Sequence, residues 1–282
     1  MARVAELRAR NVVFWDRAAP GWIRHAERHD ELGRPLGAAA LDRLRARPGE
    51  CVLDVGCGCG GTTAELAAAV GPSGVAVGVD LSEAMVVRAR QRFPGPGFIV
   101  GDVETMGIVP GASFDAAYSR MTLMLLADPV AGLTTIERSL RPGGRLAATV
   151  FRDGAAVPWL FAAVLGAAPH LGPMPPLPLS DEPGPFAFAD PKRLVRVLTV
   201  AGFGMVEVEA RDVTLDAPDE PDVVAEWLIE IGPAGAAYRE AAAPAQASAR
   251  SGAARLLERF RTPGSGYSLP TGLWLVTAAA GN

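Results

Sequence analysis

The chain has 282 residues, of which 49% are hydrophobic, and a formal net charge of −4, so it can bury a large core. It contains no basic run, and we therefore expect neither nucleic acid nor a membrane surface as its partner. The three cysteines, at 51, 57 and 59, lie too close together to join distant loops and have no further ligands at metal spacing, so we expect a cytoplasmic protein without a metal site.

The first 47 residues are expected to form a helical cap. Residues 4–18 carry apolar side chains near one helix face, and a second helical stretch covers 22–44 with a break near Gly33 and Pro35. Helical segments that precede the first strand of a domain usually pack across its mouth. We therefore expect this cap to cover the ligand site of the domain.

Residues 48–152 alternate between short apolar strands and helices. Thr62 opens a capping box, Ser82 is a typical N-cap residue, and Asp128 is followed by a proline at the first helical position. Strands separated by helices of this length indicate a doubly wound α/β fold, with a parallel sheet and helices on both of its faces. The expected strands are 51–55, 75–80, 98–101, 114–119 and 145–151.

After residue 152 the pattern becomes less regular. We expect 153–189, which contains eight prolines, and 216–268 to be insertions that form a lid over a substrate pocket. Both insertions are expected to belong to a single domain of residues 1–282, with 48–152 as its cofactor-binding core. The remaining predicted elements are helices over 191–201, 221–231 and 234–259, and strands over 204–213 and 273–280.

The loop after the first strand carries Gly56, Gly58 and Gly61 in the pattern G-x-G-x-x-G. This pattern alone identifies no cofactor, because many ligands need close approach to a glycine backbone, dinucleotides among them. An acid, Asp54, stands two residues before the first glycine, where a dinucleotide site prefers apolar residues. The loop therefore fits a ligand without a pyrophosphate better than a dinucleotide.

Two more acids, Asp80 and Asp102, follow the next two predicted strands. Because the carboxyl ends of parallel strands line one crevice, we expect Asp54, Asp80 and Asp102 to converge there. Three carboxylates suit a ligand that has cationic groups, a ribose diol and an exocyclic amine but no phosphate. S-adenosylmethionine has all of these features.

At these positions the sequence resembles the class I S-adenosylmethionine-dependent methyltransferases, over about residues 11–205. The segments that look like the five motifs of that family are, in order, residues 52–58, 77–80, 101–103, 114–129 and 140–146. The resemblance implies a Rossmann-like, mostly parallel, seven-stranded sheet. It also implies that 204–213 and 273–280 form the final strand pair, with the last strand antiparallel.

The resemblance further implies S-adenosylmethionine as the cofactor, S-adenosylhomocysteine as the product, and roles for individual residues. Gly56 and Gly58 would let the methionine moiety approach the loop, and Asp80 would bind both ribose hydroxyls. Asp102, with the backbone N–H of Val103, would bind the adenine edge. The complete candidate cofactor set is Asp54, Gly56, Cys57, Gly58, Asp80, Leu81, Asp102, Val103 and Ser119, the last through its backbone.

The methyl acceptor is predicted to be a small, largely apolar molecule, because the sequence shares elements with small-molecule methyltransferases of secondary metabolites, quinones and lipids. These elements are an Asp-Pro pair at 128–129, a Pro-Trp pair at 158–159 and Phe-x-Asp-Pro at 188–191. Residues 120–124 are bulkier and more apolar than the motifs of enzymes that methylate amino groups or bases, so we favour oxygen or carbon as the accepting atom. The candidate pocket residues, each of which could instead belong to the core, are Met121, Met124, Trp159, Phe186, Phe188 and Trp227.

A general base is the least determined part of the predicted site. Histidine is the usual choice for taking a proton near neutral pH. His25 and His29 lie four residues apart in the helical cap, and His170 lies in the first insertion. We take His25 and His29 as the catalytic candidates, although proximity and desolvation alone can suffice for an activated methyl donor.

Three other functions remain open at this point. The glycine pattern also fits an NAD-dependent oxidoreductase. A relative of the methyltransferases could keep S-adenosylmethionine as a scaffold and catalyse a cyclisation or rearrangement, and a pure binding protein is the third alternative. We expect the small-molecule acceptor to be the binding partner of the protein, and the protein itself to be a monomer or a homodimer.

Overall fold

The computed structural model describes residues 2–111, 113–172, 178 and 182–281. Its strands are β1 Cys51–Val55, β2 Val75–Asp80, β3 Gly97–Val100, β4 Phe114–Arg120, β5 Leu140–Phe151, β6 Gly204–Ala217, β7 Arg261–Thr262 and β8 Gly266–Ala279. Its α-helices are α1 Ala2–Arg24, α2 Ala26–Leu32, α3 Pro35–Leu44, α4 Gly61–Val70, α5 Glu83–Arg92, α6 Pro129–Ser139, α7 Pro158–Ala167, α8 Pro191–Val200, α9 Pro221–Ile231, α10 Gly235–Glu240 and α11 Ala243–Leu257. Four 3₁₀ turns are η1 Leu123–Leu125, η2 Gly154–Ala156, η3 Ala168–His170 and η4 Glu258–Phe260.

One sheet organises the fold, with the strand order β3-β2-β1-β4-β5-β8-β6. The pairs among β3, β2, β1, β4 and β5 are parallel, whereas β8 runs antiparallel to both β5 and β6. The predicted mostly parallel, seven-stranded sheet with an antiparallel last strand is therefore confirmed. The two-residue strand β7 pairs with β8 outside this path.

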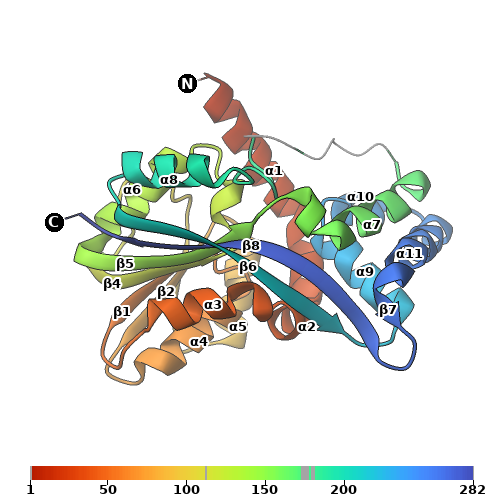
Figure 1. The fold of residues 1–282 in the computed structure, drawn as a ribbon, viewed down its shortest axis with the longest axis horizontal. Coiled ribbons are helices and arrows are strands. Elements are labelled where there is room, and N and C mark those ends of the chain that lie inside the picture. Colours follow the sequence, from red (N-terminus) through yellow and green to blue (C-terminus); the bar gives the residue numbers. More distant parts are fainter. Residues whose placement is uncertain (1, 112, 173–177, 179–181, 282) are drawn as a thin grey trace.

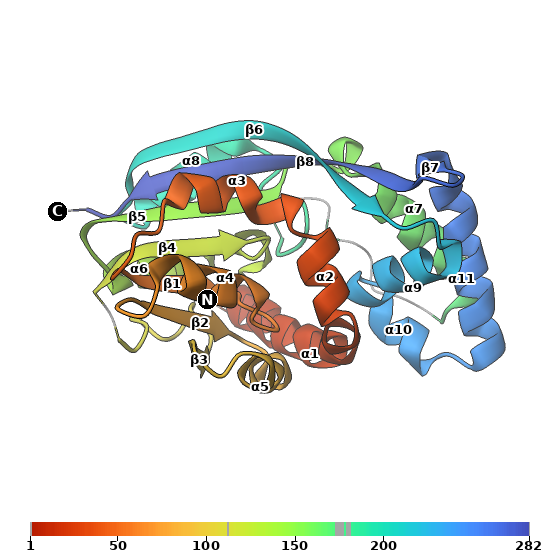
Figure 2. The ribbon, with the colours of Figure 1, turned by 90° about the horizontal axis from the view of Figure 1, so that it is seen from below.

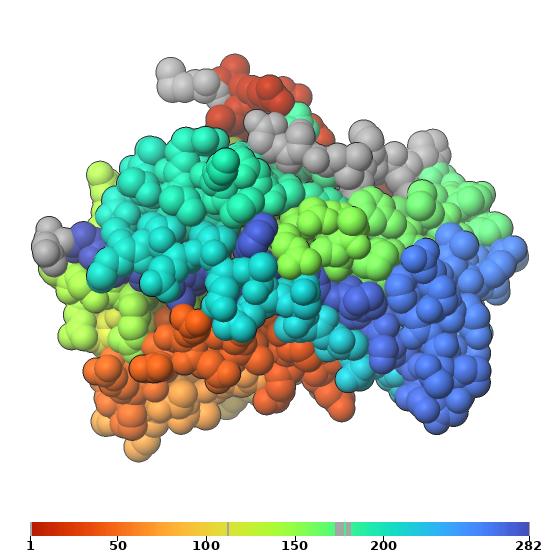
Figure 3. Space-filling model, viewed as in Figure 1, coloured from red at the N-terminus to blue at the C-terminus, as the bar shows by residue number. Residues whose placement is uncertain are grey.

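Helices cover both faces of the sheet, as the alternating pattern predicted. In Figure 1, α3, α4 and α5 lie on one face and α6 and α8 on the other. The long strands β6 and β8 extend beyond the rest of the sheet towards α7, α9, α10 and α11, which gather at one end (Figure 2). There α7 packs against α11, and the space-filling view shows their residues in contact (Figure 3). None of the described helices is long and apolar enough to cross a membrane.

Local sequence signals account for several helix starts, but not for the start of α4. The side chains of Ser82 and Asp128 accept backbone hydrogen bonds at the starts of α5 and α6, as predicted. The capping box predicted at Thr62 is wrong. Helix α4 instead follows Gly60, which has a left-handed φ of 90°, and the Thr62 hydroxyl donates to Asp54.

Two boundaries differ from the predictions for physical reasons. Part of 153–189 forms α7, whose residues are apolar around most of the helix, so the segment shows no amphipathic period. Strand β6 continues to Ala217 and β8 begins at Gly266. The segment predicted as an insertion over 216–268 therefore lies between two long paired strands and carries α9, α10 and α11.

Candidate cofactor and acceptor site

The glycine loop joins the end of β1 to α4 and is shaped by close backbone contacts. Gly56 has a φ of 75°, and a Cβ there would lie 2.0 Å from Oγ1 of Thr122. Gly58 has a φ of 51°, and a Cβ there would meet no atom within 4 Å. The loop is thus packed tightly against the end of β4 at Gly56 and faces open space at Gly58, which leaves room for a ligand beside its backbone.

Asp80, at the end of β2, is held by two backbone amides. Gly58 donates to its Oδ2 and Ser82 donates to its Oδ1, each at 2.8 Å. Burial raises the pKa of Asp80, and the two amide hydrogen bonds oppose that shift. Each carboxylate oxygen has a second lone pair, and Asp80 lines a large cavity together with Cys57 and Leu81. The geometry suits two adjacent hydroxyl groups, such as those of a ribose.

Asp54 and Ser119 do not line the cavity, which differs from the prediction. Asp54 is 1% exposed, and its Oδ2 accepts hydrogen bonds from Thr62 and Thr63 at 2.6 and 2.7 Å. The Ser119 hydroxyl donates to the carbonyl of Val55 at 3.0 Å. Both side chains therefore support the loop from behind, because alternate residues of a strand face opposite sides of the sheet.

The buried Asp54 should be a cost to stability. Burial raises its pKa to about 6, above the ordinary value of 3.8, and no described group donates to its Oδ1. The native state then binds the proton more tightly than the unfolded state, so stability is lost as pH rises from about 4 through 6. At pH 7 the buried anion should cost up to about 3 kcal/mol.

We therefore expect Asp54→Asn to raise the free energy of unfolding at pH 7 and to flatten its decline between pH 4 and 6. The asparagine carbonyl can still accept from Thr62 and Thr63. Urea unfolding of both proteins across this pH range measures the difference. Equal pH profiles for the two proteins would contradict the assignment of this buried anion.

The N-terminal helix lies against the third predicted carboxylate. Asp102 accepts a hydrogen bond from the Glu104 amide at 2.8 Å, and its Oδ2 lies 3.4 Å from Nε of Arg8 on α1. Arg8 also lies 3.4 Å from Glu104, which accepts hydrogen bonds from two further backbone amides. Asp102 and Val103 both line the cavity. The predicted adenine end is thus covered by the cap, through a contact with Arg8 that the sequence did not indicate.

A cavity of about 760 Å³ runs over the glycine loop and continues under the helices at the end of the sheet. Four predicted pocket residues line it, namely Met121, Met124, Trp159 and Trp227. Met121 has a left-handed φ of 61°, which is uncommon for a side chain of its size and is characteristic of functional sites. This volume lies within the range of small-molecule sites.

The other two predicted pocket residues, Phe186 and Phe188, are core residues and do not line the cavity. Phe186 stacks on Phe161 of α7, with ring centroids 5.5 Å apart. The guanidinium of Arg193, on α8, covers the Phe188 ring at 5.3 Å. Their surrounding sequence has no regular period because this irregular segment fills the space between two helices.

Of the three histidines, only His29 lines the cavity. Burial lowers its pKa to about 3, and the Nδ1 atom has no hydrogen-bond partner among the described residues. The prediction that His25 is also catalytic is not supported by its position, because it is buried away from the cavity. Burial likewise lowers the pKa of His25, to about 4.

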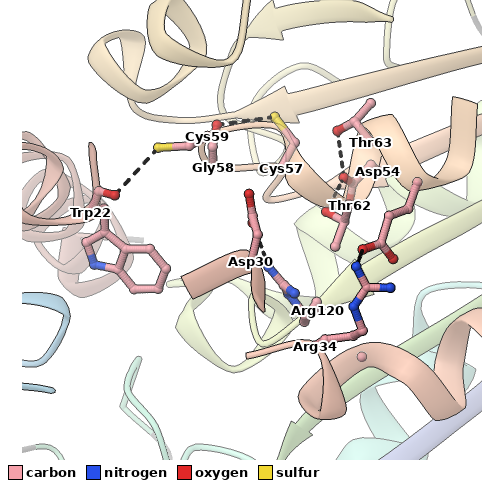
Figure 4. A network of polar contacts seen from close by, with 12 residues as sticks. Trp22, Asp30, Arg34, Asp54, Cys57, Gly58, Cys59, Thr62, Thr63 and Arg120 are labelled. Atoms are coloured by element: carbon pink, nitrogen blue, oxygen red, sulfur yellow. Dashed lines mark hydrogen bonds and ion pairs between the residues drawn. The ribbon is translucent and has the colours of Figure 1, made fainter. Parts of the chain in front are cut away.

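Two charged residues beside the glycine loop, Asp30 and Arg120, were not predicted from the sequence. Asp30, on α2, pairs with Arg92 at 2.7 Å and lies 3.7 Å from Nη2 of Arg120 at the end of β4 (Figure 4). A Cβ on Gly61 would lie 2.2 Å from Asp30 Oδ1, so the carboxylate packs on the start of α4. No motif or spacing in the sequence of the helical cap distinguishes Asp30 from its neighbours. Within the described residues, no cluster of His, Cys, Asp or Glu is arranged to hold a metal ion.

Comparisons with known proteins identify the family of this chain. A family model described as a methyltransferase domain matches residues 53–148. The nocamycin O-methyltransferase of Saccharothrix syringae is 32% identical over 206 residues, which cover 69% of this chain and 73% of that protein. An uncharacterized 37.1 kDa protein of a Streptomyces fradiae transposon is 43% identical over 119 residues, 41% of this chain, and this match spans only 34% of that protein.

A solved structure shares the fold at low sequence identity. The Haemonchus contortus phosphoethanolamine N-methyltransferase 2, in complex with phosphomonomethylethanolamine and S-adenosylhomocysteine, superposes with a TM-score of 0.52 and 19% identity, covering 87% of this chain and 52% of that one. The match to the nocamycin O-methyltransferase extends over more than two thirds of that relative, and residues 53–148, which the family model matches, include Gly56, Gly58 and Asp80. The chain therefore belongs to the class I S-adenosylmethionine-dependent methyltransferases.

Proposed function

We propose that this chain transfers the methyl group of S-adenosylmethionine to an oxygen or carbon atom of a small, largely apolar acceptor, in secondary metabolism. The observation that carries the proposal is a single cavity that reaches from Asp80 and Gly58 to Trp159 and Trp227. One end has the polar groups that a nucleoside needs, and the other has the apolar walls that an apolar acceptor needs. The relative from Saccharothrix syringae is named as an O-methyltransferase, which supports oxygen as the accepting atom.

The residues of the site would act by binding, alignment and exclusion of water. When bound, S-adenosylmethionine supplies a methyl group that is already activated on a sulfonium. Asp80 would bind the ribose hydroxyls and Asp102 the adenine edge, which fixes the nucleoside end. Met121 and Met124 border the same cavity and would keep water from the reacting atoms. Such alignment and desolvation can supply most of the acceleration for an activated donor.

Ligand-induced stabilisation tests the cofactor. S-adenosylhomocysteine at a concentration of about 100 Kd should raise the melting temperature by about 5 °C, whereas NAD should leave it unchanged. The reverse result would support the NAD-dependent oxidoreductase and end the present proposal. Because the glycine loop alone fits both cofactors, this comparison separates them directly.

The non-methylating alternative needs a different experiment. If the chain catalyses a cyclisation or rearrangement, S-adenosylmethionine remains intact while the substrate is converted. Mass spectrometry of the product, formed with cofactor that carries an isotopically labelled methyl group, separates the two reactions. A labelled product supports methyl transfer, and an isomerised product without the label contradicts it.

His29 is our candidate general base. It is neutral at pH 7 because burial lowers its pKa to about 3, so kcat/KM should show no histidine titration between pH 6 and 8. A base with so low a pKa is weak, and we expect His29→Gln to lower kcat by only about tenfold, below the usual effect of general bases. The His25→Gln variant is the matched control and should keep its kcat. Unchanged kcat in His29→Gln would remove the base assignment.

Arg120 is our candidate for binding the amino-acid end of the cofactor. Its guanidinium borders the cavity and makes no hydrogen bond to any described residue, only the 3.7 Å ion pair with Asp30. We expect Arg120→Gln to weaken S-adenosylhomocysteine binding by about tenfold, the effect of losing a charge-assisted hydrogen bond. Binding of methylthioadenosine, which lacks the amino acid, should not change. An equal loss for both ligands in calorimetry would contradict this role.

A further inference from the structure

Tryptophan is concentrated around one cavity of this molecule. The chain has five tryptophans and few aromatic residues in all, 6% of the sequence. Four of the five, Trp15, Trp22, Trp159 and Trp227, line the cavity described above. The fifth, Trp274, lies elsewhere and donates a hydrogen bond from its indole N–H to the carbonyl of Ala189. All four pack against hydrophobic clusters of the protein, and they also place aromatic rings along one ligand cavity.

The first pair of these tryptophans belongs to a ladder of rings on the N-terminal helices. Trp15 and Trp22 are seven residues apart on α1, with ring centroids 5.9 Å apart in an edge-to-face arrangement. His29 of α2 continues the ladder at 4.6 Å from Trp22. Both tryptophans are only partly buried. Their rings therefore keep surface that a ligand can contact.

This ladder lies next to the glycine loop. The Cys59 thiol, which is in the loop, lies 3.9 Å from the carbonyl oxygen of Trp22, and Figure 4 shows the Trp22 side chain on the same side of the loop as Asp30. A ring bound against Trp22 would thus lie near the place where the methyl donor binds. The ladder therefore lies beside the proposed reaction site and not on a separate surface of the protein.

The second pair lies on the helices at the end of the sheet. The Trp159 indole, on α7, is held by a 3.0 Å hydrogen bond from its N–H to the Thr271 hydroxyl. Phe151, which also lines the cavity, packs edge to face against Trp159 with centroids 6.3 Å apart. Trp227 of α9 is 1% exposed, and its N–H has no partner among the described residues. This wall is rigid and aromatic.

We infer that the methyl acceptor is a flat aromatic compound with a hydroxyl group on its ring, that Trp15 and Trp22 bind that ring beside the glycine loop, and that Trp159 and Trp227 line the rest of the acceptor pocket. The inference rests on the proposed function, because it names the acceptor of the same cavity. Aromatic pairs prefer stacked or edge-to-face contacts, and such contacts strengthen binding by about two- to twelvefold beyond the effect of the buried area. A saturated ring of equal size would gain only the area term.

An aromatic hydroxyl also fits the weak base that the site provides. In the transfer an oxygen–methyl bond forms while the methyl–sulfur bond breaks, and the sulfur leaves with the electron pair as a neutral thioether. The hydroxyl proton passes to His29 or to water. As the oxygen–methyl bond forms, the hydroxyl proton becomes strongly acidic, so a weak base such as the neutral His29 or water can accept it.

Two matched probes test the inference. The compounds 2-naphthol and decahydro-2-naphthol share a carbon skeleton and a hydroxyl group, but only the first is flat and aromatic. Calorimetry with the full chain saturated with S-adenosylhomocysteine should show about fivefold or greater preference for 2-naphthol. Equal binding of the two probes would overturn the inference.

Variants then assign the effect to the ladder. Trp22→Leu should lower the affinity for 2-naphthol by about fivefold and leave S-adenosylhomocysteine binding unchanged, Trp22→Phe should recover part of the loss, and Trp274→Phe should have no effect. Unchanged 2-naphthol affinity in Trp22→Leu, or a parallel loss of S-adenosylhomocysteine binding, would overturn the inference. If wild-type protein binds 2-naphthol through Trp22 but does not bind S-adenosylhomocysteine, the aromatic site stands and the proposed function fails.

Discussion

Asp80→Ala should weaken S-adenosylhomocysteine binding by up to about 3 kcal/mol, or about a hundredfold. The carboxylate would lose its contacts to both ribose hydroxyls. The substitution also leaves the amides of Gly58 and Ser82 without their acceptor, since each donates to Asp80 at 2.8 Å. The loop would then lose the hydrogen bond that fixes Gly58 beside the ligand. Two effects therefore act in the same direction.

Isothermal titration calorimetry with the purified chain checks this result. Asp216→Ala is a suitable control, because that carboxylate is exposed on β6 and only accepts a hydrogen bond from Ser268. The control should bind S-adenosylhomocysteine like the wild type. If Asp80→Ala also binds it like the wild type, Asp80 does not bind the ribose.

The second large effect should appear in stability. Glu230, on α9, is fully buried and pairs with two arginines, Arg24 of α1 at 3.0 Å and Arg239 of α10 at 3.5 Å. Gly21 lets the helices approach, because a Cβ there would lie 2.6 Å from the Glu230 carbonyl oxygen. One turn away on α9, Trp227 lines the cavity. The ion cluster thus joins the N-terminal cap to the wall of the acceptor pocket.

Removing one member of a buried ion cluster leaves uncompensated charge. We expect Glu230→Ala to lower the free energy of unfolding by about 3 kcal/mol, at the low end of such effects because Arg24 is 60% exposed. The matched control is Glu240→Ala, which breaks the exposed pair with Arg17 and should cost less than about 1 kcal/mol. Urea unfolding measures both. Equal losses for the two variants would show that the buried cluster has no special role.

The parts of the site that could be predicted depend on local sequence. The glycine loop and Asp80 lie within one strand–loop–helix–strand segment, where turn chemistry and strand ends decide the geometry. Asp80 therefore lies at the end of β2 as expected. The left-handed φ of Gly56 and Gly58 likewise follows from the need for glycine at such turns. The alternation of strands and helices likewise predicted the parallel part of the sheet, whereas its antiparallel last strand was implied by the resemblance to the methyltransferases.

The orientation of single side chains could not be predicted in the same way. Asp54 has the right residue type and position, but its carboxylate lies behind the loop and binds Thr62 and Thr63. Phe186 and Phe188 are aromatic and lie in the segment 153–189, which was predicted to cover the substrate pocket. They nevertheless pack in the core. The direction in which a side chain points depends on the packing of neighbouring elements. This packing cannot be deduced from the residue type or its position in the sequence.

Contacts between segments that lie far apart in the chain also could not be predicted from the sequence. The pair Arg24–Glu230 joins residues 206 positions apart, and Arg8 reaches Asp102 across 94 positions of the chain. In the sequence, nothing distinguishes Arg8 and Arg24 from the other arginines of α1. Only the folded arrangement distinguishes the charges that fasten the cap from those that face solvent.

The most direct test of this account is transfer of the methyl group itself. The purified chain would be incubated with S-adenosylmethionine carrying an isotopically labelled methyl group and with 2-naphthol, and both products analysed by mass spectrometry. The account predicts one labelled methyl group on the naphthol oxygen for each S-adenosylhomocysteine formed, and a large loss of product with Asp80→Ala. S-adenosylmethionine that remains bound and intact while an acceptor is converted without the label would contradict it.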